Sequence, residues 1–302
     1  MKILRRTRAT SRSRDGFIVV AVLWMLGALA TLASIYAVYV INTATAMSVN
    51  DTRLQAEGLM TAALELTAYR LTATEAENRP SRGDFAFRLG RAAVAVEFRS
   101  EAGRVDLNGA PRAVLAGLFA GLGAKYSDAE YYAARVVAWR TAQDQDRQNE
   151  EASAYRSAGL AYGPRQGAFA HVGELALVLG LPPFLVERAM PFVTVFSGRG
   201  EINVLAAAPE VVAAVPGMTP DRLYAVLSQV GRGPQNAQFL QAFLGDQSGI
   251  TIEAGKTARI AVRMDFDTGR RVRGEAVILL GSGEAAEPFR VLSWRDDFDG
   301  PT

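Results

Sequence analysis

The chain has 302 residues, of which 49% are hydrophobic and 21% charged, and this is the composition of a folded protein. It has no cysteine and a single histidine, His171. This composition excludes disulfide frameworks and thiolate metal sites, and it makes a multi-histidine metal site or a Ser-His-Asp triad hard to assemble. The net charge of +2 divides into +5 for residues 1–16 and −3 for the remainder, which removes the charge-based reason to expect a nucleic-acid partner.

An uncharged apolar segment covers residues 17–41, directly after the basic N-terminus. As a helix rising about 1.5 Å per residue it would reach roughly 38 Å, enough to cross a hydrocarbon core of about 30 Å. A secretory signal peptide has a shorter apolar core, although residues 44–46 (ATA) could serve as its cleavage site. An uncleaved membrane anchor fits the length, and the upstream arginines would hold the N-terminus in the cytoplasm.

A third interpretation adds a processing site to this anchor. The basic segment ends at Gly16 and the apolar helix begins at Phe17. This junction resembles the processing site of type IV prepilins and pseudopilins. The resemblance implies cleavage between the two residues and methylation of the new amine on Phe17. It also implies that residues 1–16 are a leader and residues 17–41 the retained transmembrane part of the helix.

The fifth position after the expected cleavage site is Ala21, where most pilin-like helices carry a glutamate. That glutamate is thought to pair with the free amine of a neighbouring subunit. A carboxylate in lipid is costly unless it has a partner. Its absence therefore predicts a subunit at the tip of a filament, with no neighbour above it.

The helical pattern continues through residues 42–72, which contain no proline. One long helix and two helices with a break at 42–50 both fit this pattern. Residues 73–107 and 250–302 carry strand-like alternation, including segments at 85–89, 93–98 and 103–107. These observations predict an α+β fold, in which a pilin-like long N-terminal helix packs on an antiparallel sheet.

Residues 108–249 have mainly helical texture and predict a large α-helical subdomain inserted into the sheet domain. A short strand is expected at 192–196, and the expected helices cover residues 111–122, 127–140, 172–179, 184–190, 209–215 and 220–230. Residues 105–111 and 201–209 echo each other, because each is an apolar stretch with an asparagine, followed by a proline that opens an alanine-rich helix.

Five short segments occur in a characteristic order along the chain: DLNGAP at 106–111, GAFAHVGEL at 167–175, MPFVTVF at 190–196, IN with AP at 202–209, and RVLSWR at 290–295. Together with the leader and Ala21, they resemble the protein K minor pseudopilins of the bacterial type II secretion system. The resemblance implies a structural subunit that is not an enzyme and that primes assembly at the tip of the pseudopilus. Its implied partners are minor pseudopilins I and J, the major pseudopilin, the prepilin peptidase and the inner-membrane secretion platform, with no nucleic acid. It further implies a single-pass inner-membrane protein with a periplasmic body.

The acidic stretch at 144–151 is the one place where the sequence suggests a metal. Carboxylates at Asp144, Asp146, Glu150 and Glu151 offer the oxygen ligands that calcium prefers in a flexible loop. Relatives in the resembled family carry a Trp-x-Asp-x-Asp run there, whereas the aspartates here fall three residues later after Trp139. A calcium site and a solvated charged loop are both open.

A membrane-anchored DNA-binding protein is the alternative function. Residues 167–180 and 203–217 resemble helix-hairpin-helix modules, which hold phosphates on backbone amides at a helix N-terminus. Pro182 removes one such amide, and the turn at 215–219 lacks a second glycine. The net acidic body also disfavours phosphate binding.

Overall fold

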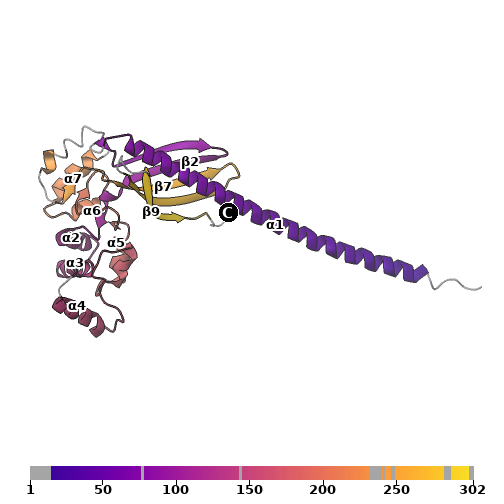
Figure 1. Cartoon of the computed structure of the whole chain (residues 1–302), viewed down its shortest axis with the longest axis horizontal. Coiled ribbons are helices and arrows are strands. Elements are labelled where there is room, and N and C mark those ends of the chain that lie inside the picture. Colours follow the sequence, from indigo (N-terminus) through magenta and orange to yellow (C-terminus); the bar gives the residue numbers. More distant parts are fainter. Residues whose placement is uncertain are drawn as a thin grey trace, which may run out of the picture. The chain divides into compact units, whose positions relative to one another are not determined.

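The computed structural model describes residues 15–75, 78–142, 145–230, 240, 242–245, 249–281 and 287–298, with the side chains of 15–16, 44–52 and 145–149 left out of the description. Contacts divide the chain into two units, Met1–Glu57 and Gly58–Thr302. Figure 1 shows the elements of both, and each unit is described separately below.

The N-terminal element is a single helix, α1, from Asp15 to Thr72. The break that the sequence left open at 42–50 is absent from it. No proline interrupts these residues. Threonine hydroxyl groups could compete for backbone hydrogen bonds, but in this helix they donate to carbonyl groups of the preceding turn. Thr31 and Thr43 each donate to the carbonyl four residues earlier at 2.8 Å.

The second unit contains a five-stranded antiparallel sheet with the order β1-β2-β7-β8-β9, built from β1 (Arg82–Leu89), β2 (Ala92–Ser100), β7 (Thr257–Phe266), β8 (Arg271–Leu280) and β9 (Phe289–Asp296). The pair β1–β2 is a tight hairpin whose turn begins at Gly90, with φ +58°. In β7, Ile260, Val262 and Met264 alternate as buried residues with more exposed neighbours, as expected for a sheet covered on one face.

The end of α1, from Gly58 onward, covers that face. Its buried residues recur every three or four positions, which places them on one side of a helix: Met60, Ala63, Leu64, Thr67, Ala68 and Leu71. Met60 lies against Gly274 of β8, where a Cβ atom would come within 3.0 Å of its sulfur. The Arg70 guanidinium lies 4.0 Å from the ring centroid of Phe85 in β1. The predicted α+β fold is therefore confirmed.

The helical subdomain is inserted between β2 and β7, so the chain leaves the sheet after Ser100 and returns at Thr257. These limits are wider than the expected 108–249. Its helices are η2 (Glu101–Gly103), α2 (Arg112–Gly121), α3 (Tyr126–Arg140), α4 (Gln145–Ser157), η3 (Val172–Leu177), α5 (Pro183–Ala189), α6 (Pro209–Ala213) and α7 (Pro220–Gln229). Figure 1 shows α2, α3 and α4 stacked away from the sheet.

Two short parallel strand pairs belong to this insertion. β3 (Val105–Asp106) pairs with β4 (Val193–Thr194), and β5 (Ile202–Asn203) pairs with β6 (Ile250–Thr251). The expectation that 103–107 extends the main sheet was wrong, because its pairing partner lies almost 90 residues downstream inside the insertion.

The internal echo at 105–111 and 201–209 has a structural counterpart, since each copy is a short strand, a turn and a helix opened by proline. Asn203 turns the backbone by accepting from the amide of Leu205 at 2.8 Å. Asn108 instead bonds both backbone groups of Phe169, at 2.7 and 3.1 Å. Each asparagine therefore satisfies the polar groups of a buried turn.

Helix α4 occupies most of the stretch expected to be an acidic loop. Its anchor is Tyr155, which is 1% exposed and has its ring centroid 6.2 Å from that of Trp139. The Tyr155 hydroxyl accepts a hydrogen bond from the amide of Leu179 at 3.0 Å. The polar majority of α4 concealed this buried side chain from sequence analysis.

Candidate anchor and assembly site

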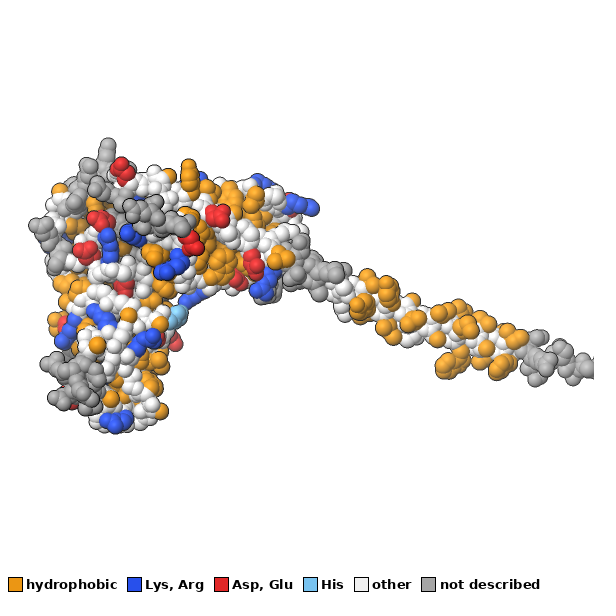
Figure 2. Space-filling model, in the orientation of Figure 1, with side chains coloured by type: hydrophobic (Ala, Val, Ile, Leu, Met, Phe, Trp, Pro, Cys, Tyr) orange, Lys and Arg blue, Asp and Glu red, His pale blue; other side chains and the backbone are white. Residues whose placement is uncertain are grey.

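The first functional segment is the apolar part of α1. Residues Phe17–Thr43 form a span of 27 residues with a mean hydropathy of 2.4, and none of its most apolar window is buried. At about 1.5 Å per residue this span is about 40 Å long, against a hydrocarbon core of about 30 Å. Figure 2 shows hydrophobic side chains along this helix. The segment has the length and the exposed apolar surface of a single membrane span.

The expected processing site lies at the start of this helix. The backbone of Gly16 and Phe17 is helical, and the Phe17 side chain is 76% exposed. The leader up to residue 14 lies outside the described residues. Ala21 is exposed on the same helix and places a methyl group where a carboxylate was expected in related helices. Cleavage after Gly16 and methylation of Phe17 stay predictions.

The acidic stretch is only partly described. Asp144 and the side chain of Asp146 lie outside the described residues. Glu151 belongs to α4 and pairs with Arg135 of α3 at 2.6 Å, where the Arg135 side chain is 12% exposed. Where side chains are described, no group of three carboxylate, histidine or cysteine residues lies close enough to hold a metal ion. The predicted calcium site, which includes Glu150, therefore stays a prediction, and a bound ion would have to compete with Arg135 for Glu151.

The insertion is joined to the sheet by a buried charged network. Glu101, in the turn η2 after β2, is 1% exposed and accepts from Nε of Arg259 on β7 at 2.5 Å. A second nitrogen of Arg259 pairs with Glu275 on β8 at 2.5 Å. Thr194, on β4 of the insertion, donates its hydroxyl to the other oxygen of Glu101. One carboxylate therefore contacts both the sheet and the inserted subdomain.

The electrostatics of this network favour the charged arginine. Burial opposes the charge of Arg259, but hydrogen bonds and the negative charges of Glu101 and Glu275 raise its pKa above the ordinary value. Removing one partner of a buried ion pair destabilises the protein, because the other charge stays desolvated. The network therefore ties the position of the insertion to the presence of Glu101.

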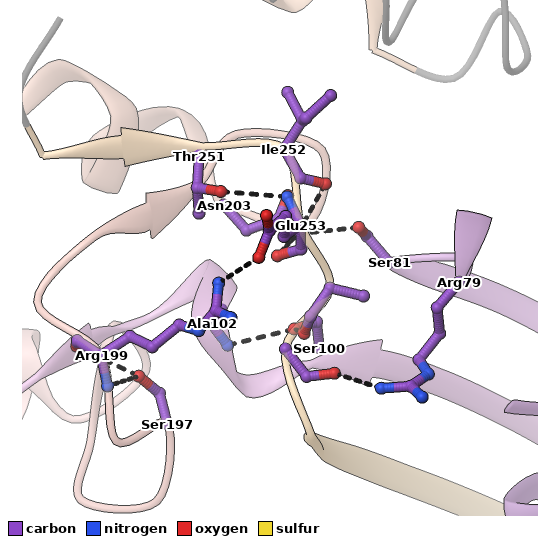
Figure 3. A network of polar contacts seen from close by, with 12 residues as sticks. Arg79, Ser81, Ser100, Ala102, Ser197, Arg199, Asn203, Thr251, Ile252 and Glu253 are labelled. Carbon is purple, nitrogen blue, oxygen red and sulfur yellow. Dashed lines mark hydrogen bonds and ion pairs between the residues drawn. The ribbon is translucent and has the colours of Figure 1, made fainter. Parts of the chain in front are cut away.

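A second, mostly neutral set of contacts completes the junction (Figure 3). Asn203 is fully buried and donates to the Ser81 hydroxyl at 2.8 Å and to the Glu253 carbonyl at 2.7 Å. Arg199 pairs with the Glu253 side chain at 2.8 Å. Arg79, which follows α1, donates to the carbonyl of Gly255 at 2.8 Å. Segments from the helix end, the insertion and the return to the sheet thus meet at one place.

The motif at 167–175 forms the start of η3 and the turn that precedes it. His171 caps η3 by accepting from the amide of Gly173 at 2.9 Å. Glu174 pairs with Arg165 at 2.8 Å and accepts from the indole of Trp139 at 3.4 Å. These contacts hold the turn between α4 and α5.

The comparisons with known proteins concern the insertion and the overall fold. Residues 98–198 match the family model described as type II secretion system (T2SS), protein K. This segment is a protein K domain of the type II secretion system. The resemblance inferred from the order of short motifs is thereby confirmed. No match was found among curated proteins.

A solved structure extends the similarity to most of the chain. One chain of the crystal structure of the GspK-GspI-GspJ complex from the enterotoxigenic Escherichia coli type 2 secretion system aligns with a TM-score of 0.61 and 16% sequence identity. The alignment covers 84% of this chain and 99% of that one. At this identity the likeness establishes the fold. The DNA-binding alternative receives no support from these matches.

Proposed function

We propose that this chain is a structural minor pseudopilin, with no catalytic activity, at the tip of a type II secretion pseudopilus. It is held in the inner membrane by the span Phe17–Thr43 and presents its body to the periplasm. There it primes assembly and helps protein export across the outer membrane. The observation that carries this proposal is the protein K domain at 98–198 following an N-terminal apolar helix in the same chain.

Minor pseudopilins I and J are the proposed direct partners, with the major pseudopilin below them and the inner-membrane secretion platform at the base. The similar solved chain comes from a complex of GspK, GspI and GspJ, and this likeness supports the choice of partners. The prepilin peptidase is the proposed processing enzyme.

Two features support a position at the tip. The insertion between Ser100 and Thr257 adds a helical body that pilin heads stacked around a helical core would have to accommodate. Ala21 provides no carboxylate for the amine of a neighbouring subunit, and an unpaired carboxylate at this depth would be costly. The six basic residues of the leader support a cytoplasmic N-terminus.

The N-terminal mass of the full chain, purified from membranes of cells with an active prepilin peptidase, tests this proposal. A chain that begins at methylated Phe17 is the expected result. Gly16→Val should block processing and secretion. Gly27→Val is the matched control, because a Cβ atom at Gly27 would meet nothing within 4 Å. An intact Met1, or a start near Met47, would refute the pilin pathway.

A further inference from the structure

A small cavity lies at the junction of the sheet and the insertion, beside the network of Glu101. Its volume is about 100 Å³, and three arginines line it: Arg99 on β2, Arg104 after η2 and Arg259 on β7. The insertion supplies apolar walls from Phe192 and from the start of α6. Ligand pockets for whole cofactors are typically about 300–1,000 Å³, so this cavity suits a single functional group.

The three arginines differ in how their charges are balanced. Arg259 pairs with Glu101 and Glu275, and Arg99 pairs with Glu97 at 2.6 Å on the surface. Arg104 donates its backbone amide to the Glu101 carbonyl at 3.0 Å. Within the described part of the chain, the guanidinium of Arg104 has no hydrogen-bond partner and no ion pair.

The surroundings of Arg104 are unfavourable for a cation. Burial and the neighbouring charge of Arg259 lower the pKa of Arg104, and the carboxylates of Glu101 and Glu275 compensate only in part because they already bind Arg259. A guanidinium offers five N–H donors in a planar fork that matches an oxyanion. An anion in the cavity would supply both the missing acceptors and the missing negative charge.

The part of the cavity wall formed by Gly103 and Ala206 is tightly packed. Gly103 approaches the backbone of Ala206 so closely that a Cβ atom would lie 2.7 Å from the carbonyl carbon. The neighbouring network of Glu101 fixes β4 against the sheet. The cavity is therefore a preformed space at a rigid junction, which keeps the ordering cost of binding low.

We propose that this cavity is an oxyanion-binding site in which Arg104 is the principal ligand, and that the group it takes is a carboxylate or a phosphate. Because residues from the sheet and from the insertion line the cavity, a bound oxyanion stabilises the junction between them. Two sources offer this chemistry: an acidic side chain of a partner protein, and a free inorganic anion.

Inorganic phosphate is the probe for the first arm of the test, with the full-length chain in detergent and ionic strength held constant with chloride. We expect the melting temperature to rise with phosphate until it saturates. In Arg104→Gln the apparent affinity should fall about tenfold or more, as expected when a hydrogen bond to a charged group is lost. Arg156→Gln, at an exposed position of α4, removes the same charge elsewhere and should behave like the unaltered chain.

Without phosphate, Arg104→Gln should melt at the same temperature as the unaltered chain or higher, because it removes a positive charge that its surroundings balance only in part. Arg104→Lys keeps the charge without the fork and should retain part of the phosphate effect. An equal phosphate response in Arg104→Gln and the unaltered chain would overturn the site. A lower melting temperature of Arg104→Gln without phosphate would overturn the claim that the charge of Arg104 is balanced only in part.

The second arm separates the two sources by measuring affinity for minor pseudopilins I and J. If Arg104→Gln weakens the binding of pseudopilins I and J, and phosphate competes with these proteins for the unaltered chain, the ligand is a carboxylate of a partner. If binding is unchanged while the phosphate effect is lost, the ligand is a free anion. This arm rests on the proposed function, whereas the phosphate arm does not, so failure of the two can be distinguished.

Discussion

Replacing Glu101 tests whether the charged network holds the insertion on the sheet. Glu101→Gln preserves shape but removes the negative charge that Arg259 contacts at 2.5 Å. Breaking a buried ion pair costs about 3–5 kcal/mol when the remaining charge has no other partner. Here Arg259 keeps Glu275, and 16% of its side chain is exposed, so we expect a cost at or just below the low end of this range, about 2–3 kcal/mol.

For a body of this size, about 1 kcal/mol corresponds to a shift of roughly 2–4 °C in melting temperature. The expected decrease is therefore roughly 4–12 °C, measured by thermal unfolding of the full chain in detergent. Glu97→Gln is the matched control because it breaks an exposed pair with Arg99, in which the two side chains are 54% and 61% exposed. Its cost should stay below about 1 kcal/mol. If the two substitutions lower the melting temperature equally, the network contributes no more than a surface pair, and this reasoning fails.

Three further outcomes follow from close packing and buried polar groups in the insertion. Gly117→Ala places a Cβ atom 2.2 Å from the carbonyl oxygen of Ala214, so we expect the free energy of unfolding, measured by chemical denaturation, to fall by about 1–3 kcal/mol. Gly121→Ala is the control and should be neutral, because a Cβ atom there meets nothing within 4 Å. Tyr155→Phe leaves the amide of Leu179 without its acceptor and should cost about 1–3 kcal/mol by the same measurement. Burial raises the pKa of Tyr155, so the unfolded chain loses this proton first, and stability should fall as pH rises above about 10. Tyr155→Phe should make the melting temperature decline less steeply in that alkaline range, and an unchanged slope would contradict the assignment.

The features that the sequence predicted correctly depend on local patterns. The apolar run and the absence of proline predicted the membrane span and the continuous helix, because both are properties of neighbouring residues. The strand-like alternation in 250–302 predicted strands there for the same reason, and β7 and β8 lie within this range. The order of short motifs identified the family without any knowledge of contacts.

The features that escaped prediction depend on distant partners. Val105 pairs with Val193, and the strand that contains it carries no signal of which sheet it joins. Glu101 reaches Arg259 across 158 positions of sequence, so neither residue stands out as functional alone. The sole local hint was an acidic residue directly after an alternating strand. The cavity beside Arg104 depends on both of these long-range arrangements and could not be anticipated.

The junction explains how a large insertion keeps one orientation on the sheet. Buried polar groups are tolerated only where their partners are in place. The Glu101–Arg259 network and the separate contacts of Asn203 are satisfied together in one geometry of the junction. An apolar interface of the same size would allow the insertion to pack on the sheet in several ways. For a subunit proposed to project its insertion from the end of a filament, a fixed direction is what allows partners to dock reproducibly. Arg104 departs from this pattern of satisfied groups, and that departure is why its cavity is the place where an added ligand would act on the junction.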